Sequence, residues 1–152
     1  MAANTLLSEL GGKVIMGSQH DEIVETWLAD GTAKAGWLVG LSGTDLVVSG
    51  TDVGGLEYFI GIALPRYDTD VDTSFTGDDL IDVVIPISGH YYAVLMANPS
   101  ATLEGATPLS WGATAGAVHK CATIQGSADV QIIAYNKEQV ITGTTFALVR
   151  WA

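Results

Sequence analysis

The chain has 152 residues, the length of one ordinary domain with its own core. It carries 6 Lys and Arg against 17 Asp and Glu, a formal net charge of −11, so its surface repels phosphate backbones and anionic lipid. We therefore expect neither nucleic acid nor membrane as a partner. The single cysteine, Cys121, excludes an internal disulfide and agrees with synthesis in a reducing cytoplasm.

The first 22 residues show no strong hydrophobic periodicity, and we predict that they form an extended N-terminal arm. A short strand over residues 13–16 is one option within it. The start of the chain lacks the basic region and the long apolar stretch of a signal peptide.

Residues 23–152 are predicted to form a single all-β domain, a small β-barrel or β-sandwich, because short apolar runs alternate with Gly-rich turns. The first four predicted strands cover residues 23–29, 37–41, 45–49 and 57–64. The second and third of these runs are joined by a three-residue turn, which predicts a hairpin. Gly61 lies inside the fourth run and indicates a bulge or a close backbone approach.

The stretch from residue 81 to residue 96 is predicted to form a second hairpin. Apolar side chains alternate along both of its arms, and Ser88-Gly89 supplies a turn between them. Pro86 cannot donate a backbone hydrogen bond, so the first arm should have an edge or a bulge there. The later predicted strands cover residues 108–111, 118–122, 130–135 and 145–151.

An acidic loop over residues 68–79 is the candidate metal site. Its carboxylates at the first, third, fifth and twelfth positions match those of a calcium loop. Thr73 stands where such loops need glycine, and no helices flank the loop, so a solvated acidic loop is the interpretation that we favour. We expect no cofactor, with calcium as the alternative. The candidate calcium ligands are Asp68, Asp70, Asp72 and Asp79.

The sequence gives little support to catalysis, and we expect no enzyme activity. Ser88-Gly89-His90 brings suitable residue types together, but neighbouring side chains on a strand or turn point apart and triads are assembled in space. His119 and Cys121 could share a strand face, yet no second pair completes a zinc site. A hydrolase would require His20 or His90 to find a carboxylate across the fold.

Gly-punctuated segments recur in a distinctive order: a Gly-then-apolar strand, a Gly-Ile-Ala strand, a Gly-Asp strand closed by Gly, and two later segments. They are residues 36–39, 59–63, 78–89, 104–109 followed by 114–118, and 144–151. This order resembles that of the capsid decoration (cement) proteins of tailed bacterial and archaeal viruses, of the β-tulip type. The resemblance covers residues 34–152.

The resemblance implies a compact β-tulip or barrel, often trimeric, that binds the local threefold positions of an icosahedral head and has no catalytic residues. Our first hypothesis is a decoration protein on the outer surface of the virion head, bridging neighbouring major capsid subunits as a homotrimer. Apolar side chains in the arm without a domain core to join usually need a partner. The predicted contact residues are Leu6, Leu7, Leu10, Val14 and Ile15.

The second hypothesis is a carbohydrate-binding β-sandwich module, with calcium assistance through the acidic loop as an option. Flat aromatic rings with a polar edge suit the faces of pyranose sugars. Core packing explains at least two of the tryptophans equally well. The candidate platform residues are Trp27, Trp37, Trp111, Trp151, Tyr91 and Tyr92.

Overall fold

The computed structural model describes residues 14–16, 22–29, 33–41, 47–49, 58–65, 74–75, 79–97, 102–111, 116–121, 132–137 and 146–152. Within these ranges the chain forms eleven strands and no helix, which confirms the all-β prediction. No helix in these ranges has the length and apolarity to cross a membrane.

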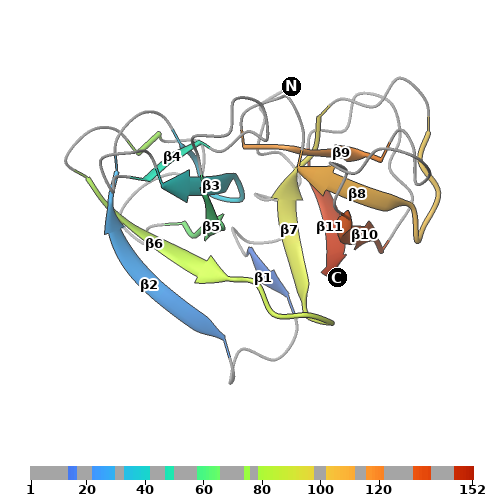
Figure 1. Ribbon diagram of the computed structural model, residues 1–152, viewed down its shortest axis with the longest axis horizontal. Coiled ribbons are helices and arrows are strands. Elements are labelled where there is room, and N and C mark those ends of the chain that lie inside the picture. The colour runs from blue at the N-terminus through green and yellow to red at the C-terminus, as the bar shows by residue number, and fades with distance from the viewer. Residues whose placement is uncertain are drawn as a thin grey trace.

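The strands belong to two antiparallel sheets (Figure 1). The six-stranded sheet has the order β1-β7-β11-β10-β8-β9, and the five-stranded sheet has the order β2-β6-β5-β3-β4. The described strands do not close into one barrel. Their bounds are β1 Ile15–Met16, β2 Ile23–Leu28, β3 Leu38–Leu41, β4 Val47–Ser49, β5 Tyr58–Ala63, β6 Leu80–Ile85, β7 Tyr91–Leu95, β8 Pro108–Trp111, β9 Val118–Lys120, β10 Ile132–Asn136 and β11 Phe146–Trp151.

The predicted hairpin over residues 81–96 is wrong. Strand β6 pairs with β2 and β5, whereas β7 pairs with β1 and β11 in the other sheet. The segment between them crosses from sheet to sheet, since Pro86 cannot continue a ladder and Gly89 has a φ of +85°. Alternation identified both strands correctly, but it does not specify the strand with which each one pairs.

The predicted hairpin of the second and third runs is confirmed as β3 and β4. The bulge predicted near Gly61 is also present, because the pairing of β3 with β5 shifts register between Val39 and Gly40. A side chain at Gly61 would collide with the backbone carbonyl of Val84. The close backbone approach is therefore real, and glycine is required at this position.

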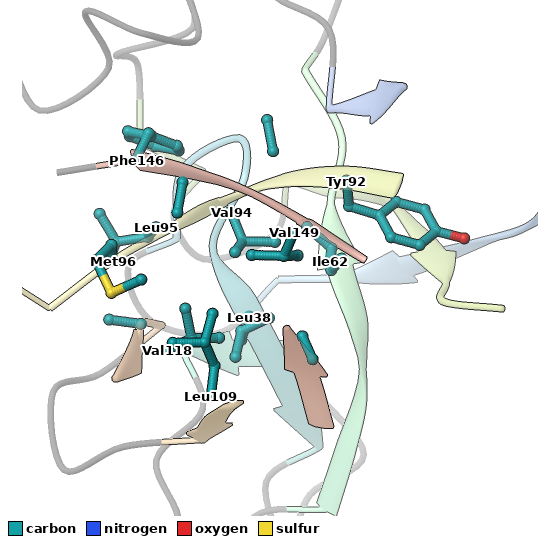
Figure 2. Packing of buried hydrophobic residues seen from close by; sticks show 14 of the residues in the cluster. Leu38, Ile62, Tyr92, Val94, Leu95, Met96, Leu109, Val118, Phe146 and Val149 are labelled. Atoms are coloured by element: carbon teal, nitrogen blue, oxygen red, sulfur yellow. The ribbon is translucent and has the colours of Figure 1, made fainter. Parts of the chain in front are cut away.

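The main core lies between the two sheets (Figure 2). Leu38, Ile62 and Val84 face it from the five-stranded sheet, and Tyr92 and Phe146 are among the side chains that face it from the other. A second cluster packs against the opposite face of the five-stranded sheet. Its buried members are Ala29, Ala33, Val39, Ala63, Phe75, Ile81 and Val83.

The backbone at Gly36 joins the two sheets directly. Its N–H donates to the Ala63 carbonyl at 2.8 Å, and its carbonyl accepts from the Leu95 N–H at 2.9 Å. Ala63 ends β5 and Leu95 ends β7, so one residue bridges both layers. Gly36 has a φ of +82°, and an added Cβ would lie 2.5 Å from the Phe146 ring. Only glycine fits both the conformation and the space.

We predict that Gly36→Ala lowers the free energy of unfolding by about 2–4 kcal/mol, because left-handed strain adds to a steric clash in the core. Gly89→Ala is the matched control, since Gly89 has a similar φ of +85° but no atom within 4 Å of an added Cβ. Gly89→Ala should lower the free energy of unfolding only by the cost of the left-handed backbone conformation, about 1 kcal/mol. Urea denaturation measures both values, and equal losses would contradict the role of Gly36.

Candidate functional site

The structure places two of the predicted arm contacts inside the chain's own fold. Val14 is 1% exposed within the main core, Ile15 packs against that core, and the Val14 carbonyl accepts from the Ala93 N–H. The premise that these side chains have no core to join is therefore corrected, because β1 adds to β7. Leu6, Leu7 and Leu10 lie outside the described residues, and their contact role stays a prediction.

The acidic loop remains untested as a calcium site. Asp68, Asp70 and Asp72 lie outside the described residues. Asp79 lies just before β6, and its backbone carbonyl accepts from the Ala29 N–H at 2.8 Å. In the part of the chain that the structure describes, no group of three His, Cys, Asp or Glu side chains could hold a metal ion.

The three candidate tryptophans whose side chains the structure describes do not share one surface. Trp37 and Trp151 pack against the main core, and Trp151 meets Tyr92 edge to face at a centroid distance of 6.3 Å. Trp27 packs against the second cluster, on the other side of the five-stranded sheet. Core packing therefore accounts for Trp37 and Trp151, which removes these two rings from the proposed sugar platform.

A buried carboxylate fastens the segment before β2 to the crossover between β6 and β7. The Glu22 side chain is 3% exposed, and its two oxygens lie 2.6 Å from His90 Nδ1 and 2.7 Å from the Tyr92 hydroxyl. That hydroxyl also accepts from the Ile87 N–H at 3.0 Å. Burial, together with the nearby Glu22, raises the pKa of Tyr92, while the Ile87 N–H opposes the shift. Tyr92 therefore remains a protonated donor to Glu22 at neutral pH.

This cluster meets the condition set for a hydrolase, because His90 has found a carboxylate in Glu22. A hydrolase of this kind also needs a nucleophile within reach of the histidine. Among the described side chains, no Ser, Thr or Cys is hydrogen-bonded to the His90 ring, and both Glu22 oxygens are already engaged. The described contacts of the cluster join segments that are far apart in the sequence.

A second pair of suitable residue types is also incomplete. Ser110 Oγ lies 3.3 Å from His119 Nε2 across strands β8 and β9, and Ser110 is only 4% exposed. The other ring nitrogen of His119 is buried without a hydrogen-bond partner, so no carboxylate orients the ring. Cys121 is buried nearby in sequence as a free thiol. Among the described residues, no carboxylate completes a triad with Ser110 and His119, and no group of three candidate ligands could hold a metal ion.

We predict that Tyr92→Phe lowers the free energy of unfolding by about 1–3 kcal/mol, because it leaves the Ile87 N–H without an acceptor and removes a donor from buried Glu22. Tyr135→Phe is the control, since Tyr135 lies on the outer face of the six-stranded sheet and is only partly buried. Thermal and urea unfolding measure both variants. Equal stability of Tyr92→Phe and wild type would contradict the anchoring role.

The stability that Tyr92 contributes should depend on pH in the alkaline range. Its pKa is raised in the folded protein, so this contribution is complete below the ordinary tyrosine value of about 10 and is lost as the pH rises above it. The difference in unfolding free energy between wild type and Tyr92→Phe should therefore shrink above about pH 10. Urea titrations across the alkaline range measure it, and a difference that grows would contradict the assignment.

Two tyrosines and two basic side chains form an exposed group on the outer face of the six-stranded sheet, here called the tyrosine–cation patch. Lys137 Nζ lies 4.6 Å from the centroid of the Tyr91 ring, and the Arg150 guanidinium lies 5.4 Å from that of Tyr135. Arg150 pairs with both tyrosines across neighbouring strands. The four residues line a shallow hollow of about 370 Å³. The sequence did not predict the patch, because its four residues come from segments that are distant in the chain and meet only in the folded sheet.

The second exposed feature is strand β2, which lies at the end of the five-stranded sheet (Figure 1). Large apolar side chains are exposed on β2 and on its neighbour β6: Ile23 by 53%, Val24 by 47%, Leu28 by 38% and Leu80 by 63%. The sequence predicted the strand. It did not indicate that the strand lies at an edge.

No family model matches this chain, and no curated protein matches it. Solved structures share its fold. One is the N base of the head fibre gp8.5 of bacteriophage phi29, which is 14% identical, with a TM-score of 0.51 and coverage of 86% of this chain and 94% of that one. Another is from the capsid of the Myoviridae phage XM1, which is 13% identical, with a TM-score of 0.57 and coverage of 90% of both chains. Both are phage structural proteins.

Proposed function

We propose that this chain is a capsid decoration protein that binds the outer surface of a phage head and stabilises it by bridging neighbouring major capsid subunits. The observation that carries the proposal is the fold shared, over most of each chain, with a phage head fibre base and a phage capsid component. The role is structural rather than enzymatic.

The tyrosine–cation patch is the surface that we assign to the head. Tyrosine and arginine are enriched at the energetically important positions of protein interfaces. The whole chain has 6 Lys and Arg and a net charge of −11, and the patch gathers Lys137 and Arg150 within one hollow. It is therefore a place where an acidic protein surface can approach this otherwise acidic molecule. Modest contacts of this kind are multiplied by the many copies on a symmetric shell.

Binding to isolated heads tests the proposal. Purified wild-type protein should co-sediment with heads of the encoding virus from which this protein has been removed. The double change Lys137→Glu and Arg150→Glu should weaken binding by about tenfold or more, because it replaces attraction by repulsion. Lys120→Glu is the control for the reversal of a single charge. Lys120 is exposed on β9 and does not line the hollow, so this change should leave head binding nearly unchanged.

The outcomes separate the function from the surface. Failure of the wild-type protein to bind heads would overturn the decoration role. Binding that the double charge reversal leaves unchanged would overturn only the assignment of the patch. The family resemblance implies a homotrimer, and a single chain contains no contact that tests it. The mass in solution decides between the homotrimer and the twofold contact inferred below.

A further inference from the structure

We infer that the outer edge of β2 is a self-association surface, which pairs with β2 of a second copy of this chain in an antiparallel register centred on Thr26. The inference goes beyond the proposed function, because it does not require a phage head. It rests on the direction of the backbone groups along β2, on the exposed apolar side chains, and on the registers that two identical strands can adopt.

The backbone groups of alternate β2 residues point away from the sheet. The Ala29 N–H bonds to the Asp79 carbonyl, and the Asp82 carbonyl accepts from the Leu64 N–H on the β5 side. Thr26 pairs with Asp82, so in an antiparallel ladder its own N–H and carbonyl face outward. The same alternation directs the backbone groups of Val24 and Leu28 outward. In the described part of the chain, no strand pairs with this edge.

The side chains of β2 do not protect this edge. Natural proteins block exposed edges with lysine, proline, bulges or covering segments. The sequence of β2 is IVETWL, which has one charge, and its pairing with β6 has no register shift. Val24 and Leu28 lie on one face of the sheet with Leu80 beside Leu28. An apolar edge with which no described strand pairs is a template for another strand.

The strand is self-complementary in the register centred on Thr26. Two antiparallel strands form hydrogen bonds only where residues with outward-pointing backbone N–H and carbonyl groups lie opposite each other. With Thr26 opposite Thr26 of the second copy, Val24 of each copy lies opposite Leu28 of the other. The pairing therefore contains two apolar Val–Leu pairs related by the twofold axis. Glu25 then lies opposite Trp27, and these side chains already hydrogen-bond within one chain at 3.2 Å. Centring the register on Glu25 would instead place like charges directly opposite each other, which is unfavourable.

The resulting contact has twofold symmetry and joins two five-stranded sheets into one continuous sheet. It differs from the threefold assembly that the family resemblance implies, so the solution mass distinguishes the two. Each copy carries a net charge of −11, and the two copies repel each other at long range. Salt screens this repulsion, so association through β2 should strengthen as the salt concentration rises.

Sedimentation equilibrium tests the contact. Wild type should approach twice its monomer mass of 15.9 kDa with increasing concentration. Val24→Lys, at an exposed position, should raise the dissociation constant by about tenfold or more without changing the folded monomer's circular dichroism. Ser88→Lys adds the same charge at an exposed turn and should have no effect. A wild-type monomer or trimer at all accessible concentrations would overturn the inference.

Disulfide trapping tests the register. In the proposed pair, Thr26→Cys places two thiols directly opposite each other, about 5.5 Å apart between Cα atoms, which is within bridging range. Val24→Cys places its two thiols several residues apart along the pair. Thr26→Cys should therefore form a cross-linked dimer under mild oxidation, and Val24→Cys should not. Equal cross-linking of both variants, or none in either, would contradict the register.

Discussion

The hydrogen bonds of one glycine hold the two sheets at a fixed separation. Gly36 donates to the end of β5 and accepts from the end of β7, and the Phe146 ring fills the space where a side chain would lie. Because buried backbone groups must be paired, this bridge determines which strand ends face each other. The bridge lies beside the shared core between the sheets, which Figure 2 shows.

The second connection between distant segments is polar. Glu22 reaches the crossover between β6 and β7 through His90 and Tyr92, and it thereby fixes the start of β2. The ladder with β6 holds β2 along its inner edge, and no described strand pairs with its outer edge. The tyrosine–cation patch lies on the other sheet, and β2 ends the five-stranded one. A head and a second copy can therefore occupy separate surfaces of the same molecule.

Local patterns in the sequence predicted most strands but not their partners. Alternation located β6 and β7, yet the same alternation is compatible with a hairpin and with a crossover, and the structure has the crossover. The close approach at Gly61 was predictable, because it requires a glycine within an otherwise apolar strand and that glycine is visible in the sequence. The contacts of Glu22 with His90 and Tyr92 span 68 and 70 residues, and no short-range rule connects them. Val14 joined the core for the same reason, through pairing of β1 with β7.

The central claim is that this two-sheet body is a structural component of a phage head. Cryo-electron microscopy of the virus that encodes the chain tests it most directly. The account predicts density on the outer surface of the head into which both sheets fit, with the outer face of the six-stranded sheet turned toward the shell. Virions whose heads carry no such density, or that contain the chain only elsewhere in the particle, would contradict it.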